Sequence, residues 1–170
     1  LIGAMQSPLA QDGGTNGRYL RIVSIAIATG AIEQFAYPLT NIGTASKPKY
    51  PTVSEITAIN DHELLVDERD GKGLGDNSTA VFKQIFHIDI RNGQDVSGIS
   101  GEANLATRAL TKTVFADLVA QLNAHGIHDV RVLTNRRVAA VAAPIHSAQI
   151  VQFDHDDEPY LSEVITDDGR

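Results

Sequence analysis

Charged side chains gather in one short stretch of the chain, directly after an apolar run. Residues 64–66 are apolar at consecutive positions, which is typical of a strand buried on both faces, and Asp67, Glu68, Arg69 and Asp70 follow at once. Carboxylate oxygens can hold a hard cation such as Ca²⁺, and arginine can bind phosphate oxygens in a bidentate manner. The stretch therefore suits a phosphorylated ligand with a bridging metal ion. The alternative is a solvated strand end with an internal ion pair.

Strand geometry separates these charges onto two faces. Because side chains alternate along a strand, Glu68 and Asp70 are predicted to point together, and Arg69 to point to the other face. We therefore predict Glu68 and Asp70 as catalytic carboxylates and, together with Asp76, as calcium ligands. The glycine-rich segment 70–77 has some likeness to a calcium loop, but it lacks the glutamate that closes an EF-hand loop.

Composition limits the classes of partner. The formal net charge of −7 argues against a general nucleic-acid surface and permits cation binding. The chain has no cysteine, so disulfides and thiolate metal sites are excluded. No apolar run approaches the roughly 20 residues that would span a bilayer. The first residue is leucine, within a strand-like run, so we expect a fragment of a longer protein.

A repeated pattern predicts the fold. Similar β-rich runs occur at 21–30, 84–93 and 149–157, and further candidate strands flank each of them. Four consecutive antiparallel strands form the blade of a β-propeller. We predict a mainly β chain, a partial propeller of two to three four-stranded blades within a single domain 1–170: blade 1 about 1–39, blade 2 about 53–99 and blade 3 about 129–165.

One segment is expected to interrupt the sheets. Between 111 and 125, four apolar residues recur at helical spacing, and Gly126 is a suitable residue to end a helix. We predict one inserted amphipathic helix here, lying over the sheets with its apolar stripe in the core.

The predicted blades bring distant loops to one rim. In a four-stranded antiparallel blade, the connection after the second strand and the connection to the next blade emerge on the same side. Lys47 and Lys49 lie in the long connection 40–52, and Arg69 follows the second strand of blade 2. We predict these three cations as substrate-binding residues for phosphate oxygens.

The chain resembles the phytase-like domain family, described as "esterase-like activity of phytase", over about residues 1–127. The matching segments are 3–9, 21–23 with 29–30, 36–39, 53–56, 64–70, 85–89, Lys112 and 115–118. The resemblance implies a propeller-like fold, an extracellular or periplasmic location and activity as a phosphoric-ester hydrolase. The chain departs from the family after the predicted helix, where it has His128-Asp129-Val130-Arg131 in place of a Lys-x-Glu-Gly segment.

Two functions of different classes follow. The first is a metal-assisted phosphoric-ester hydrolase acting on a small phosphorylated or ester substrate, with calcium as its cofactor. The alternative is a non-catalytic propeller module that binds a partner or a glycan on its loop rim.

Arg69 provides a test of the strand assignment. If Arg69 primarily ties its strand to the adjacent one, Arg69→Ala should lower the melting temperature more than Lys72→Ala, because Lys72 lies in an exposed glycine loop. Thermal unfolding of the two variants measures the difference. Equal melting temperatures, with ligand binding lost only in Arg69→Ala, would return Arg69 to the ligand site.

Overall fold

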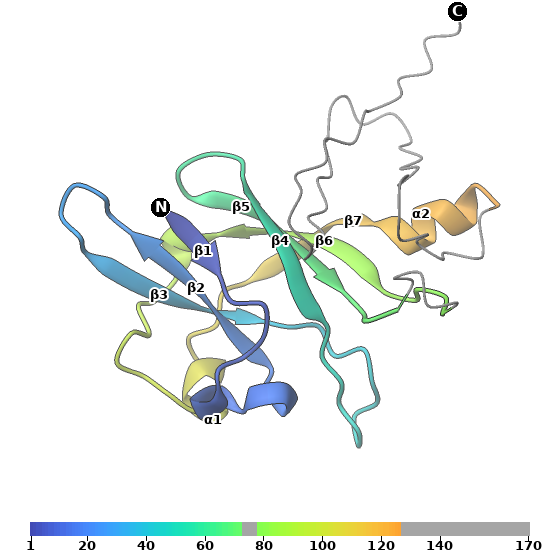
Figure 1. The fold of residues 1–170 in the computed structure, drawn as a ribbon, viewed down its shortest axis with the longest axis horizontal. Helices are drawn as coiled ribbons and strands as arrows, with labels where there is room; N and C mark the ends of the chain where they lie inside the picture. Colours follow the sequence, from blue (N-terminus) through green and yellow to red (C-terminus); the bar gives the residue numbers. More distant parts are fainter. Residues whose placement is uncertain (73–77, 127–170) are drawn as a thin grey trace, which may run out of the picture.

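A computed structural model describes residues 1–72 and 78–126, and within them the chain is mainly β (Figure 1). The predicted third blade and Asp76 lie outside the described residues. The first sheet has the order β1-β2-β3 and the second the order β4-β5-β6-β7, with every neighbouring pair antiparallel. The strands are β1 (Ile2–Ala4), β2 (Tyr19–Ile25), β3 (Ile32–Pro38), β4 (Thr52–Ala58), β5 (Glu63–Arg69), β6 (Lys83–Asp89) and β7 (Lys112–Asp117).

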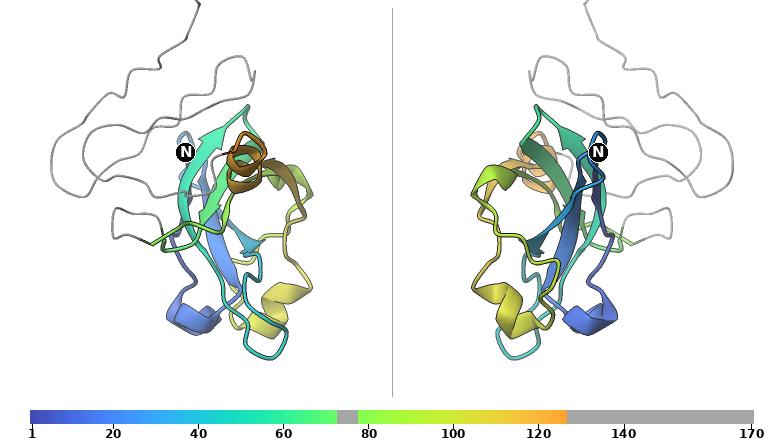
Figure 2. Two further views of the ribbon diagram at one scale, coloured as in Figure 1. Left: turned by 90° about the vertical axis from the view of Figure 1, so that its right-hand side faces the viewer. Right: turned by 90° about the vertical axis from the view of Figure 1, so that its left-hand side faces the viewer.

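Short helices lie between the strands. Two 3₁₀ helices, η1 (Ala10–Asp12) and η2 (Gly14–Asn16), precede β2, and η3 (Ile90–Asn92) follows β6. The α-helices are α1 (Glu102–Ala106) and α2 (Leu118–Ala124). Figure 2 shows η1, η2, α1 and the connection between β3 and β4 at the same end of the molecule.

The main hydrophobic core lies between the two sheets. Leu20, Ile22 and Tyr37 from the first sheet pack in one cluster with Leu64 and Val66 from the second. Burial alternates along β5, so that its buried face carries Leu64, Val66 and then Glu68. Asp67 and Arg69 lie on the other face, as predicted, and Asp70 follows the end of the strand.

The connection between β6 and β7 crosses to the first sheet and covers that sheet's other face. Val96 and Leu105 form a second core cluster with Tyr19 and Ala36. The same connection pairs with the edge of β3, since the amide of Val96 donates to the carbonyl of Gln34 (2.8 Å). The yellow-green trace in Figure 1 follows this crossing. Residues 95–99, a weak candidate strand at the end of the predicted blade 2, form no strand, and β7 is the fourth strand of the second sheet.

The predicted helix over 111–125 is only half correct. Residues 112–117 form β7, and a helix begins only at Leu118. Asp117 marks the boundary, since its side chain accepts a hydrogen bond from the amide of Ala120 (2.9 Å), as a helix N-cap does. The β-branched and aromatic residues Thr113, Val114 and Phe115 favour a strand. The prediction of a helix relied instead on the helical spacing of the apolar residues in 111–125. Val114, expected in the core, is 57% exposed.

The two sheets, of three and four strands, do not close into a ring within the described part of the chain. The structure therefore establishes a mainly β fold of two packed antiparallel sheets, and the propeller stays a prediction.

A buried ion pair fixes the covered face of the first sheet. The Arg21 side chain is 2% exposed and contacts Asp12, which is fully buried, through two bonds of 2.7 and 3.0 Å. Arg21 also donates to the carbonyls of Val96 (3.0 Å) and Ile99 (2.6 Å). The amide of Gly101 donates to Asp12 (3.2 Å), so this one ion pair joins η1, β2 and the β6–β7 connection.

Removing one partner of this pair should be costly. Arg21→Gln leaves the Asp12 carboxylate buried without its charge partner, which costs about 3–5 kcal/mol in comparable pairs. Urea unfolding would measure the loss. The matched control is Arg91→Gln, which breaks the exposed Arg91–Asp89 pair and should lower the unfolding midpoint far less. Equal effects of the two variants would contradict a structural role for the Arg21–Asp12 pair.

Candidate functional site

Of the predicted site residues that the structure describes, Glu68, Arg69 and Asp70 lie at the end of β5, and Lys47 and Lys49 lie in the connection from β3 to β4. Glu68 is fully buried between the sheets. The hydroxyl of Tyr37 donates to its Oε1 (2.6 Å), and the amide of Thr40 donates to its Oε2 (3.1 Å). The ammonium of Lys112 donates to the same Oε1. Both oxygens of Glu68 are thus engaged by groups of the protein itself.

Lys112 lies within this buried cluster, at the start of β7. Its ammonium nitrogen is 3.9 Å from the centroid of the Phe86 ring and 4.9 Å from that of Tyr37. It also donates to the hydroxyl of Thr40 (2.8 Å). Burial lowers the pKa of Lys112, and the Glu68 carboxylate opposes that shift. The Lys112–Glu68 pair therefore ties β7 to β5 and to the root of the 39–51 connection.

Tyr37 acts as a hydrogen-bond donor in the cluster. Burial, together with the neighbouring Glu68 carboxylate, raises the pKa of the Tyr37 hydroxyl far above its usual range. The hydroxyl therefore keeps its proton across the physiological pH range and stabilises the charged Glu68. Neither Tyr37 nor Lys112 was predicted to belong to the site, because both residues meet Glu68 from positions distant in the sequence.

Asp70 has a different environment from Glu68. Its carboxylate is buried, with the residue 3% exposed, and Oδ2 accepts from the amides of Val81 (2.9 Å) and Phe82 (3.2 Å). The other oxygen, Oδ1, has no hydrogen-bond partner among the described residues, and the ammonium of Lys83 lies 3.6 Å from it. Burial lowers the pKa of Lys83, and the Asp70 carboxylate opposes that shift. Oδ1 of Asp70 can therefore accept a hydrogen bond from a ligand or bind a metal ion.

The other face of the strand end carries a second set of charges. Arg69 donates to the hydroxyl of Ser54 on β4, so it does bridge to the adjacent strand. Asp67 lies opposite Glu55 in the β4–β5 register. Burial raises the pKa of Asp67, Lys83 and Arg69 oppose the shift, and Glu55 adds to it.

The predicted phosphate-binding lysines are in an exposed part of the 39–51 connection. Their backbone is ordered by a narrow ladder, with the amide of Ile42 donating to the carbonyl of Lys49 (2.8 Å) and the amide of Thr44 donating to that of Lys47 (3.1 Å). Neither lysine forms an ion pair with any residue that the structure describes. In residues 1–72 and 78–126, no group of three histidine, aspartate or glutamate side chains is placed to hold a metal ion.

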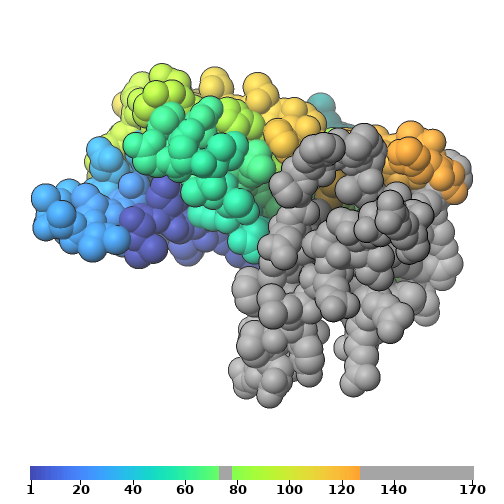
Figure 3. Space-filling model, turned by 90° about the horizontal axis from the view of Figure 1, so that it is seen from above, coloured from blue at the N-terminus to red at the C-terminus, as the bar shows by residue number. Residues whose placement is uncertain are grey.

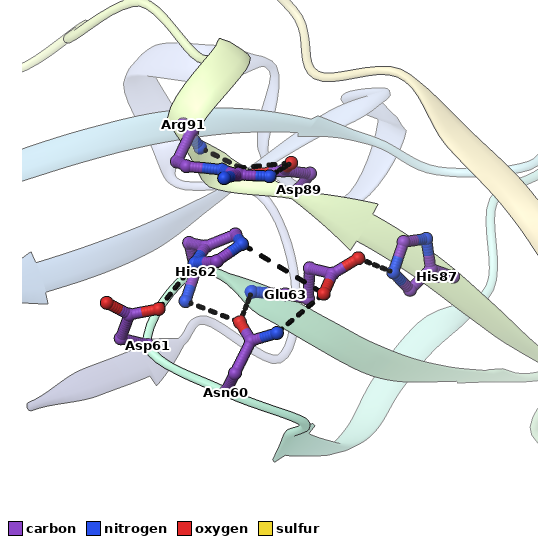
Figure 4. A network of polar contacts seen from close by, with 7 residues as sticks. All are labelled: Asn60, Asp61, His62, Glu63, His87, Asp89 and Arg91. Atoms are coloured by element: carbon purple, nitrogen blue, oxygen red, sulfur yellow. Dashed lines mark hydrogen bonds and ion pairs between the residues drawn. The ribbon is translucent and has the colours of Figure 1, made fainter.

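A second polar cluster lies at the opposite end of the second sheet (Figure 4). The turn between β4 and β5 and the residues after β6 meet there, and Figure 3 shows these two segments side by side. Asn60 accepts from the amides of His62 (3.0 Å) and Glu63 (2.8 Å), which closes the turn. Glu63 in turn contacts the ring of His87 at 3.1 Å. The bonds from Asn60, and secondarily from His87, lower the pKa of Glu63. These contacts close the β4–β5 turn and join the start of β5 to β6, so the cluster has a structural role.

Comparison with known proteins identifies the family. The family model described as "Phytase-like: Esterase-like activity of phytase" matches residues 1–140. The chain belongs to this phytase-like family. The description of the family suggests an esterase-like hydrolase. No curated protein and no solved structure matches the chain.

Among the described residues, no helix is both long and apolar enough to cross a membrane.

The raised pKa of Asp67 predicts a pH-dependent stability. A carboxyl whose pKa is higher in the folded state costs stability once it ionises, so stability falls as the pH rises from the unfolded value, about 3.9, through the folded value. Asp67→Asn should therefore raise the urea midpoint at pH 7 and leave it unchanged at about pH 3.

Asp89→Asn provides a control of opposite sign. The hydrogen bond from Arg91 lowers the pKa of Asp89 to about 2, so this variant should be less stable than the parent at pH 7. An Asp67→Asn effect of the same size at both pH values would contradict the assignment.

Proposed function

We propose that the chain carries part of the site of a phosphoric-ester hydrolase, with Asp70 as its central carboxylate. The observation that supports the proposal is Oδ1 of Asp70, a buried acceptor without a hydrogen-bond donor among the described residues. Buried polar atoms are normally hydrogen-bonded. Within the described part of the chain, Oδ1 has only the Lys83 ammonium, at 3.6 Å, so its place at a loop-bearing strand end suits a ligand or a metal ion. Membership of the phytase-like family supports ester hydrolysis as the reaction.

Calcium is the metal that we propose. Asp70 Oδ1 is the acceptor that fits it, and Asp76 is the predicted second ligand. Bound at this position, Ca²⁺ would supply Lewis-acid polarisation of a phosphoryl oxygen. Weak calcium sites suit an extracellular or periplasmic protein, because calcium is abundant there.

The chain's own charges have separate proposed roles. Lys47, Lys49 and Arg69 would bind phosphate oxygens, as their charge and position on the rim allow. Asp70 would hold or orient the attacking water. Since both oxygens of Glu68 are engaged within the protein, we assign Glu68 to positioning: it holds the root of the lysine-bearing connection through the amide of Thr40. Its predicted roles as a catalytic group and as a metal ligand remain to be tested.

The two sheets would be neighbouring blades of a larger propeller. In that arrangement, the end of β5 and the connection from β3 to β4 share one rim, as the Thr40–Glu68 bond requires.

Substitution of Asp70 tests the proposed site. In the full chain, Asp70→Asn should lower the rate of aryl phosphate hydrolysis about 100-fold or more, because it removes the charge that would hold the metal ion and orient the attacking water. It should also abolish any rise in melting temperature on adding Ca²⁺. The control is Asp89→Asn, at the far end of the sheet, which should retain both activity and the calcium response. Retention of both properties by Asp70→Asn would contradict the proposal.

Both oxygens of Glu68 accept hydrogen bonds from the protein itself, and this favours a second, non-catalytic function. A carboxylate that is satisfied internally suits a non-catalytic module that binds a partner or a glycan on its rim. A folded full chain without phosphatase activity and without calcium-linked stabilisation would support this module over the enzyme.

A further inference from the structure

A hollow of about 260 Å³ opens beside the proposed site, at the end of the molecule where η1, η2 and the 39–51 connection meet. The segment before β2 forms one wall, and the two ends of the 39–51 connection form the other. No lining residue carries a charge: the lining consists of Ser7, Pro8, Thr15, Gly17, Leu39, Tyr50, Pro51 and Thr52.

The first wall is held firmly in place. Its two 3₁₀ turns are closed by backbone bonds, from the amide of Asp12 to the carbonyl of Leu9 and from that of Gly17 to Gly14 (both 2.9 Å). A Cβ on Gly17 would lie 2.4 Å from the carbonyl oxygen of Asp12, so only glycine permits this close approach. The Asp12 carboxylate is in turn fixed by the buried Arg21 guanidinium.

The second wall is fixed by the other buried ion pair. Leu39 donates from its amide to the carbonyl of Arg18 (2.8 Å), and the next amide, that of Thr40, donates to Glu68. At the other end of the connection, Thr52 pairs with Arg69 in the β4–β5 register. Thr52 thus belongs both to the wall of the hollow and to the strand pair that leads to Asp70.

These observations define a pre-formed, uncharged subsite next to charged groups. Ligand sites typically combine apolar walls with a few polar groups that fix orientation, and Leu39 and the prolines, with the hydroxyls of Ser7, Thr15, Tyr50 and Thr52, provide that combination. An apolar cavity of about 150 Å³ is large enough for benzene. The volume of the hollow therefore suits one ring or a short alkyl group.

We propose that the hollow holds the uncharged alcohol group of the substrate ester, whose phosphate lies against the neighbouring rim. This inference rests on the proposed function and specifies its substrate class: a phosphomonoester of a small aryl or alkyl alcohol. A polyphosphorylated substrate would place further phosphates in a wall without lysine or arginine, on a chain of net charge −7. Such a wall offers them no charge partner.

The test uses the full chain and separates binding in the hollow from hydrolysis. Benzyl alcohol serves as a neutral probe and is observed by saturation-transfer NMR. Benzyl phosphate is compared with inorganic phosphate for affinity by calorimetry. Benzyl phosphate should bind at least tenfold more tightly than inorganic phosphate, and benzyl alcohol should compete with it.

Ser7→Phe should fill the hollow. It should abolish the benzyl alcohol signal and reduce the affinity for benzyl phosphate to that for inorganic phosphate, which should itself be unchanged. The matched control is Thr57→Phe, an exposed position on β4 that does not line the hollow, which should behave as the parent. Circular dichroism of both variants verifies folding, and Thr15→Trp provides a second filling variant if Ser7→Phe does not fold.

Two results would overturn the inference: failure of benzyl alcohol to bind the parent chain, or binding that the filling variants leave unchanged. Tighter binding of inositol hexakisphosphate than of benzyl phosphate would also overturn it. The proposed function fails by a different result, which is normal binding of benzyl phosphate without any hydrolysis.

Discussion

The buried carboxylate of Glu68 is the group on which the arrangement of the two sheets depends. It accepts from Lys112 within the second sheet, and from Tyr37 and the amide of Thr40 on the side of the first sheet. Each charge of the Glu68–Lys112 pair is removed from water, and neither would be tolerated there alone, because an isolated buried ion is far more costly than a paired one. The cation lies over the rings of Phe86 and Tyr37, so aromatic faces and one carboxylate together replace its hydration. Through the amide of Thr40, the same carboxylate also sets where the chain leaves the first sheet.

A second buried pair, Arg21–Asp12, holds the β6–β7 connection against the opposite face of the first sheet. One pair lies between the sheets and the other lies beneath the crossing connection. Together they fix the backbone on both sides of an open hollow, although neither contributes a side chain to its lining. The two charged pairs thus hold the backbone in place, while uncharged groups line the hollow.

Local patterns in the sequence were sufficient for much of the second sheet. The alternation in β5 correctly placed Glu68 on the same face as Leu64 and Val66, since period two is a property of one strand. The apolar run 64–66 was expected to be buried on both faces, but Leu65 is only partly buried. What could not be predicted depends on distant partners. Lys112 forms its buried ion pair because Glu68 and Phe86 lie on β5 and β6 of the same sheet. The strand β7 was missed because the apolar residues in 111–125 also recur at helical spacing. Residues 95–99 carry a weak strand pattern, and nothing local indicates that they pair with the edge of β3 in the other sheet.

The crossing of the β6–β7 connection onto the first sheet has a consequence for how the chain can be divided. The guanidinium of Arg21 bonds to the carbonyl of Ile99, a separation of 78 residues, and its carboxylate partner accepts from Gly101. During synthesis, β1, β2 and β3 emerge long before the segment that covers their second face, and such long-range closure is slow. A boundary drawn between the sheets would leave the first one with an open apolar face and half of a buried charge network. A transfer of the first sheet to another protein would therefore have to include the β6–β7 connection that covers it.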